Sequence, residues 1–197
     1  MASKILNTPL DGTPKQIVFA DHDTDFSPTA TSDLRITDDG SMELEVQFDL
    51  TDVANDACRQ SDKFDFGAHW ASAYAVQGAL EFAASGLTAG NTVSLYFGFK
   101  SINSDANANP GGCSGSDGAY TGYAGSTAAQ SVVHLTGPFR GIVSADSTGT
   151  IQIIDFGILY VPQRYGVLVF GNTSGAAMHS DAVESHIVLT PIVPESQ

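Results

Sequence analysis

One short stretch of the sequence contains the residue types of a hydrolase triad. His179, Ser180 and Asp181 are consecutive, and they follow a polar turn motif at residues 171–175. In a working triad the serine and the aspartate hydrogen-bond to opposite nitrogens of one imidazole ring. Adjacent residues of an extended segment point to opposite sides of the chain, so they do not meet in this way. The spacing favours turn residues at the end of a hairpin over a catalytic relay.

The sequence contains no stronger signal for catalysis. It has neither the G-x-S-x-G elbow of α/β-hydrolases nor the H-E-x-x-H motif of zinc proteases. The 22 acidic residues leave a glycosidase-like pair of carboxylates open, but no spacing singles one out. We therefore predict a protein that is not an enzyme and that has neither catalytic residues nor a cofactor.

Three carboxylates at alternate positions have the spacing that begins a calcium-binding loop. They are Asp21, Asp23 and Asp25. The sixth position of such a loop requires glycine and the twelfth a bidentate glutamate, whereas this chain has Phe26 and Ser32 there. We expect a solvated acidic loop and no bound metal.

Cys58 and Cys113 are the only cysteines, and neither has a partner at the spacing of a zinc site. The residues after Met1 lack the apolar stretch of a signal peptide, and no later segment approaches the roughly 18 apolar residues of a membrane span. We expect a protein made in a cytoplasm. Reduced thiols are favoured there, with a disulfide as the alternative.

Composition indicates one loop-rich β domain. The chain has 197 residues, of which 42% are hydrophobic and 15% charged, so polar uncharged residues must cover much of the surface. The formal net charge of −14 argues against binding to nucleic acid or to an anionic membrane, because both need clustered lysine and arginine. The same charge suits a soluble protein or one that docks on a basic partner.

Period-two patterns predict an all-β fold. Apolar residues alternate with polar ones from Met42 to Leu50, and the Asp39-Gly40 pair before them predicts a hairpin with residues 34–37. Residues 69–84 fit a strand better than a helix, because their large side chains fall on even positions. Further strands are expected at 15–20, 91–100, 131–145, 150–161, 165–172 and 185–193. We predict an antiparallel, jelly-roll-like β-sandwich of eight or nine strands at residues 15–197, preceded by an arm at 1–14.

Residues 101–130 lack a strand pattern and are rich in Asn, Asp, Ser, Gly and Ala. Loops of this length in a compact domain are usually functional or disordered. The glycines are not followed by the Lys-Ser/Thr of a phosphate-binding loop. We therefore predict an interaction loop, with candidate residues Asn109, Pro110, Gly111, Gly112, Tyr120 and Tyr123.

Another pattern extends over residues 55–197. It comprises segments 74–76, 109–112, 119–122, 164–169, 172–184 and 187–192. These segments resemble a family of small structural proteins of tailed bacteriophages. The resemblance implies a virion component that decorates or cements the capsid by bridging neighbouring capsid subunits, with a tail or head-tail position as the alternative. It brings no catalytic residue.

The implied partners are the major capsid protein or other virion proteins and further copies of the chain, most simply a trimer. Receptor or glycan binding is a second hypothesis, because sandwiches of this kind hold sugars on aromatic platforms. Trp70, Tyr120, Tyr123 and Tyr165 could provide such a platform, although core packing is the simpler expectation for Trp70.

Overall fold

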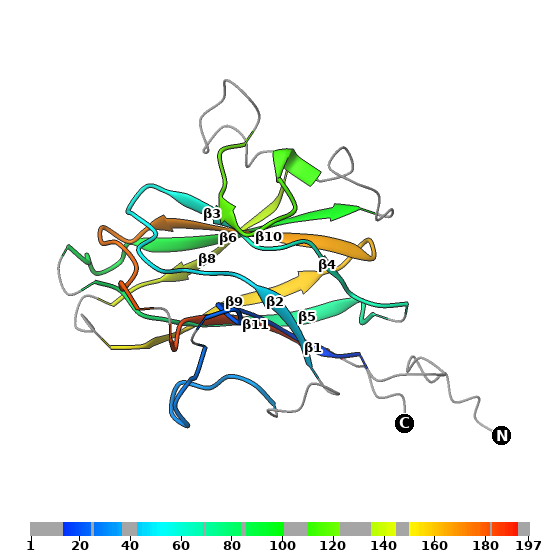
Figure 1. Cartoon of the computed structure of the whole chain (residues 1–197), viewed down its shortest axis with the longest axis horizontal. Helices are drawn as coiled ribbons and strands as arrows, with labels where there is room; N and C mark the ends of the chain where they lie inside the picture. Colours follow the sequence, from blue (N-terminus) through cyan, green and yellow to red (C-terminus); the bar gives the residue numbers. More distant parts are fainter. Residues whose placement is uncertain are drawn as a thin grey trace.

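Two β-sheets packed face to face form the protein (Figure 1). The computed structural model describes residues 14–24, 26–36, 43–68, 70–83, 86–100, 110–122, 135–144, 150–181 and 183–192. No α-helix is present in this part of the chain. The predicted all-β sandwich is confirmed. The predicted arm at 1–14 lies outside the described residues except for Pro14.

Sheet A has five strands. In spatial order they are β2 (Glu43–Gln47), β1 (Gln16–Ala20), β11 (His186–Pro191), β5 (Ala73–Leu80) and β9 (Gln152–Tyr160). Neighbours are antiparallel except β1 and β2, which are parallel. A parallel pair needs a long crossover connection, and residues 21–42 provide it. The predicted hairpin is therefore wrong: residues 34–36 form no strand, and β2 pairs with β1.

Sheet B has six strands. In spatial order they are β7 (Gly118–Ala119), β3 (Cys58–Gln60), β10 (Tyr165–Thr173), β6 (Thr92–Lys100) and β8 (Thr136–Ile142), and β4 (Phe64–Asp65) also pairs with β10. A short 3-10 helix, η2 (Pro110–Gly112), lies in the connection between β6 and β7. The predicted loop at 101–130 thus contains two short elements.

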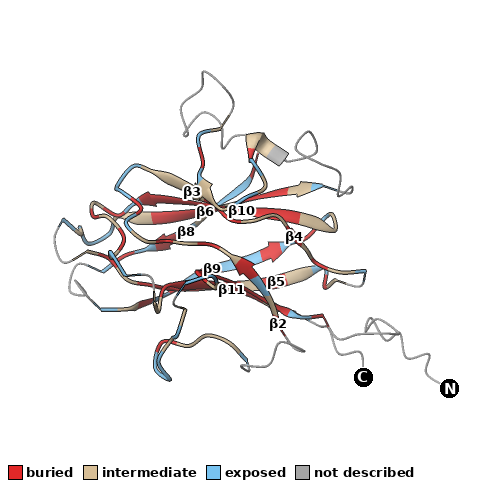
Figure 2. Cartoon of the chain, in the orientation of Figure 1, coloured by how far each residue is buried: buried red, intermediate tan, exposed pale blue. Residues whose placement is uncertain are grey.

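Apolar side chains from alternate strand positions fill the space between the sheets (Figure 2). In β5 the inward residues are Tyr74, Val76 and Leu80, as the even-numbered pattern predicted. Gly78 also faces inward, where an added Cβ would lie 3.1 Å from the Phe156 ring. A strand over residues 69–84 is confirmed for Ala73–Leu80, and its alanines lie on the face opposite Tyr74 and Val76.

The crossover connection packs on the outer face of sheet A over β1 and β11. Phe26 and Leu34 from this connection pack on Val18 of β1 and Val188 of β11. This contact explains why β1 is buried at all five positions. The strands β5 and β9 lie at the other edge of the sheet, beyond β11.

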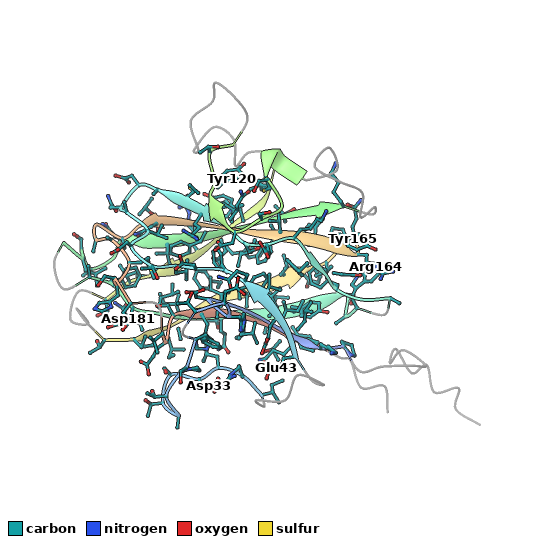
Figure 3. All side chains as sticks on the ribbon, viewed as in Figure 1. Asp33, Glu43, Tyr120, Arg164, Tyr165 and Asp181 are labelled. Carbon is teal, nitrogen blue, oxygen red and sulfur yellow. The ribbon has the colours of Figure 1, made fainter. Side chains whose placement is uncertain are left out.

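The connection between β6 and β8 covers sheet B in a similar way. Cys113, Tyr120 and Leu135 pack on the outward residues Val167 and Val169 of β10. Tyr120 lies above sheet B in Figure 3. Each sheet is therefore covered on part of its outer face by a connecting segment.

Candidate interaction surface

The His179-Ser180-Asp181 stretch forms a local turn. The backbone N–H of Asp181 donates to Nδ1 of His179 at 3.1 Å, and Nε2 of His179 lies 3.9 Å from a carboxylate oxygen of Glu81. No hydrogen bond joins Ser180 to the imidazole in the described part of the chain. These contacts are those of turn residues and give the ring no serine nucleophile to activate.

The acidic loop is held by a glutamine. Nε2 of Gln47 donates to Oδ1 of Asp21 at 2.6 Å, and Oε1 of Gln47 accepts from the backbone N–H of Asp23 at 3.1 Å. Asp25 lies outside the described residues. Within the described ranges no group of three or more His, Cys, Asp or Glu residues is arranged to hold a metal ion.

Both cysteines are free thiols. Burial raises the pKa of the Cys113 thiol to about 12, and burial also raises the pKa of Cys58. A thiol is a nucleophile only as the thiolate, so neither side chain is activated for chemistry at neutral pH. Cys113 acts as an apolar residue of the cluster over β10.

The predicted interaction loop is anchored by one of its own candidates. The hydroxyl of Tyr120 donates to the backbone oxygen of Gly111 at 2.6 Å, and the Tyr120 side chain is 3% exposed. Gly111 and Gly112 both have positive φ and form the bend of η2, which begins at Pro110. Asn109 and Tyr123 lie outside the described residues. Tyr120 therefore stabilises the loop, and its ring is not available to a sugar.

Two other candidate aromatic residues also have structural contacts. Trp70 is half-buried against the main core. The Tyr165 ring lies beneath the guanidinium of Arg164 at 5.2 Å, and Arg164 forms two hydrogen bonds of 2.7 Å with the carboxylate of Asp65. Figure 3 shows Arg164 and Tyr165 together at one end of the sandwich, away from Tyr120.

Large apolar side chains are exposed in a row along the edge strand β9. Ile153 and Ile158 are each 50% exposed and Tyr160 is 73% exposed. Their neighbours on β5 are alanines: Ala79 pairs with Ile153, Ala75 with Ile158 and Ala73 with Tyr160. Figure 2 shows the exposed stretches of β9 in pale blue. These three residues, Ile153, Ile158 and Tyr160, are here called the β9 row, and the exposed Asp155 lies between the first two.

A β-bulge places these residues on one face. The register between β5 and β9 shifts between Val76, which pairs with Gly157, and Gln77, which pairs with Asp155. Gly157 has φ +93°, and its N–H donates to Oδ1 of Asp155 at 2.8 Å. The bulge adds one residue to β9 and so reverses its alternation. Odd-numbered residues of β9 point outward before the bulge, and even-numbered residues point outward after it. Ile158 therefore points outward like Ile153.

Replacing Gly157 with alanine is expected to lower the free energy of unfolding by about 1 kcal/mol. The backbone there lies at φ +93°, which an L side chain rarely adopts, although an added Cβ would meet no atom within 4 Å. The cost is therefore conformational and not steric. Thermal unfolding of the variant measures it. Gly90→Ala, at φ +84° with similarly open space, is a matched control outside β9 and should lose a similar amount.

A cavity of about 380 Å³ opens beside the first residues of β9. Its lining combines hydroxyl groups, carboxylates and aliphatic side chains. The lining residues are Thr29, Thr31, Ser32, Thr150, Glu81, Glu184, Ile151 and Ile153. None of these described residues is basic or aromatic. Ile153 belongs both to this cavity and to the β9 row, so the two features meet at this residue.

The cavity wall at residues 29–32 is a hydrogen-bonded turn fastened to the segment before β11. The Thr29 N–H lies 3.0 Å from both Oε1 of Glu184 and the hydroxyl oxygen of Ser32. The backbone N–H of Ser27 donates to the backbone oxygen of Val183 at 2.8 Å. Glu184 thus positions the turn with one carboxylate oxygen while its side chain also lines the cavity.

A buried histidine holds the rest of this connection. His186 is 0% exposed; its Nδ1 donates to the backbone oxygen of Glu184 at 2.7 Å, and its Nε2 accepts from the Leu34 N–H at 3.1 Å. This pattern requires a neutral ring. Burial lowers the pKa of His186, and it outweighs the opposing effects of the Glu184 backbone oxygen and of Asp33.

The sequence reasoning missed the β9 row, the cavity and His186. The available signal for the row was Gly157 inside an apolar run, since glycine in a strand often marks a bulge. No helix in the described part of the chain is long and apolar enough to cross a membrane. No family model, curated protein or solved structure matches this chain.

Proposed function

We propose that this chain is a non-enzymatic structural protein of a tailed-phage particle that decorates or cements the capsid by bridging neighbouring capsid subunits. The observation that carries the docking function is the β9 row. The phage particle itself comes from the resemblance of residues 55–197 to small virion proteins. Further copies of the chain, for example in a trimer, are part of the same proposal.

The β9 row has the properties of a contact surface. Single exposed apolar residues are common on proteins, whereas here three lie on one face of a nine-residue edge strand, with the exposed Asp155 between Ile153 and Ile158. Burial of such side chains contributes roughly 25 cal/mol for each Å² of apolar surface removed from water. Ala73 and Ala75 of β5, which pair with Tyr160 and Ile158, are small and partly exposed, so a folded partner could approach closely at this end of the two strands.

The bulge at Gly157 favours docking over the face of β9 instead of along its edge. Bulges interrupt the ladder of hydrogen-bonding groups that a second strand would need. A partner that covers the face does not depend on that ladder. Each docked copy that buries on the order of 1,000 Å² across a capsomer joint would stabilise the assembled shell by mass action.

The test is binding to purified capsids that lack the protein, measured by cosedimentation. A double variant, Ile158→Ser with Tyr160→Ser, is expected to bind at least about tenfold more weakly than the unmodified chain, because it removes the two apolar side chains beyond the bulge. Circular dichroism and thermal unfolding should be unchanged, since both side chains are at least half exposed.

Ile36→Ser is the matched control. Ile36 is 64% exposed but lies in the connection over β1, separated from β9 by two strands. This variant should bind capsids normally. Equal binding by the double variant would show that the β9 row is not the docking face, and absence of binding by the unmodified chain would overturn the capsid function itself.

A further inference from the structure

We propose that the cavity beside β9 receives a lysine side chain of the protein that docks on sheet A. The inference rests on the proposed docking function and names the chemistry of the partner surface. It starts from the lining of the cavity, where two carboxylates, four hydroxyls and two isoleucines surround about 380 Å³.

The polar part of the lining suits a primary ammonium group. An ammonium group donates three hydrogen bonds and accepts none, so it needs several oxygen acceptors around it. Glu81 and Glu184 contribute carboxylates from the same end of two neighbouring strands: Glu81 directly follows β5, Glu184 shortly precedes β11, and the Glu81 N–H donates to the Ser185 hydroxyl at 3.2 Å. The hydroxyl oxygens of Thr29, Thr31 and Ser32 add neutral acceptors from the turn that Glu184 contacts. Charge-assisted hydrogen bonds of this kind are about twice as strong as neutral ones.

The existing contacts leave acceptor capacity in both carboxylates. Oε1 of Glu184 accepts from the Thr29 N–H, which fixes that side chain against the wall without using its second oxygen. Nε2 of His179 lies 3.9 Å from Oε1 of Glu81 and is therefore beyond hydrogen-bonding distance. No basic residue lies among the described residues that line the cavity, so a cation must come from outside.

The apolar part of the lining suits the stem of lysine. Ile151 and Ile153 line the same cavity, and a lysine side chain buries its methylene groups along apolar surface while its charged end reaches polar groups. A sugar would instead be expected to stack on an aromatic ring, and the described lining contains none.

Continuity with the β9 row indicates a protein partner. Ile153 lies in both features, so a partner that covers the whole β9 row also contacts the cavity. The chain carries a formal net charge of −14, which attracts a basic surface and speeds its approach. The inferred partner surface is therefore apolar with a protruding lysine.

The test uses the isolated, isotope-labelled protein and two small probes in NMR titrations. One probe is Nα-acetyl-lysine N-methylamide, and the other is the same compound with its ε-amine acetylated. The charged probe is expected to shift the backbone amide signals of Thr29, Glu184 and Ile153, at millimolar concentration. The acetylated probe should not shift them. A response to both probes, or to neither, would overturn the inference.

A variant pair isolates the two carboxylates. Glu81→Gln with Glu184→Gln is expected to weaken binding of the charged probe at least about tenfold. The amide oxygen at position 184 can still accept from the Thr29 N–H, so the wall should remain in place. Glu45→Gln with Asp52→Asn makes the same change in net charge at two exposed residues away from the cavity lining and should bind normally.

The outcomes separate this inference from the docking function. Equal weakening in both double variants would show that only the overall charge attracts the probe and would overturn the lysine site. Shifts of the same amides by methyl glucoside, without shifts by the lysine probe, would identify a polyol site and also overturn it. Neither result bears on capsid binding through Ile158 and Tyr160, which the cosedimentation experiment tests separately.

Discussion

Replacing Asn172 with alanine is expected to lower the free energy of unfolding by roughly 2–4 kcal/mol. Asn172 is 0% exposed, and its amide nitrogen donates to the backbone oxygens of Val53 at 2.9 Å and Ala176 at 2.8 Å. Its Oδ1 accepts from the N–H of Ser174 at 3.1 Å and from the hydroxyl of the same residue at 2.7 Å. Alanine removes all four bonds and leaves a cavity. Urea unfolding followed by the fluorescence of Trp70 measures the loss.

Asn55→Ala is the control for this prediction. Oδ1 of Asn55 accepts from the Gly175 N–H at 2.8 Å in the same turn, but the residue is exposed, so water can replace the bond. We expect a loss below about 1 kcal/mol there. Asn172→Asp should cost more than Asn172→Ala, because it buries a charged group and directs an oxygen at two carbonyl oxygens. Similar losses at positions 55 and 172 would refute the central role of Asn172.

For Asn172 the sequence predicted the turn but not the burial of the side chain. The Gly171–Gly175 motif indicated a turn, and β10 does end at Thr173. Composition could not show that the asparagine side chain points into the protein, because asparagine is equally suited to an exposed turn. Its partner Val53 is distant in sequence and reaches it only through the fold.

Strand positions were predictable because alternation follows directly from burial on one face. The patterns at Ala73–Leu80 and Thr92–Lys100 each predicted a strand and its inward side. Sheet membership was not predictable in the same way. Of the three apolar runs in the last fifty residues, β9 and β11 belong to sheet A and β10 to sheet B. A pattern of alternation identifies a buried face without identifying the neighbouring strand.

The β9 row could not be predicted either, because the alternation pattern alone does not show where a bulge reverses it. Strict alternation from Ile153 would direct Ile158 and Tyr160 into the core, and only the bulge at Gly157 reverses them. In contrast, Tyr120 is in a polar loop, yet it is 3% exposed because its ring covers the outward residues of β10. Local composition predicts exposure poorly wherever a loop packs over a sheet.

Replacing His186 with leucine is expected to lower the free energy of unfolding by roughly 1–3 kcal/mol, because two buried backbone groups lose their partners. These groups are the Leu34 N–H and the Glu184 backbone oxygen. The connection over sheet A should loosen, which hydrogen exchange at Leu34 would detect. His186→Gln, which can still accept from Leu34, should lose less. Unchanged exchange at Leu34 in the leucine variant would contradict this role.

The buried imidazole should also make stability depend on pH. Its pKa in the folded chain is lowered by burial from the ordinary value of 6.5, so above about pH 6.5 the ring is neutral in both states and its contribution is complete. As the pH falls below 6.5, the unfolded chain binds the proton first, and stability declines until the pH passes the folded-state pKa. The charged groups that act on the ring are Asp33, Arg35 and Glu184.

The comparison that tests this dependence is between the unmodified chain and His186→Gln. Hydrogen bonding to Arg35 lowers the pKa of Asp33 below 3.8, so titration of that carboxyl lies outside the window. Urea unfolding between about pH 8 and about pH 5 should show that the unmodified chain loses stability on acidification faster than the glutamine variant. Parallel curves would mean that the ring is equally easy to protonate in both states. We expect the two stability curves to diverge below about pH 6.5. His186 would then be the residue through which acid weakens the attachment of the β1–β2 connection, which lines the cavity, to sheet A.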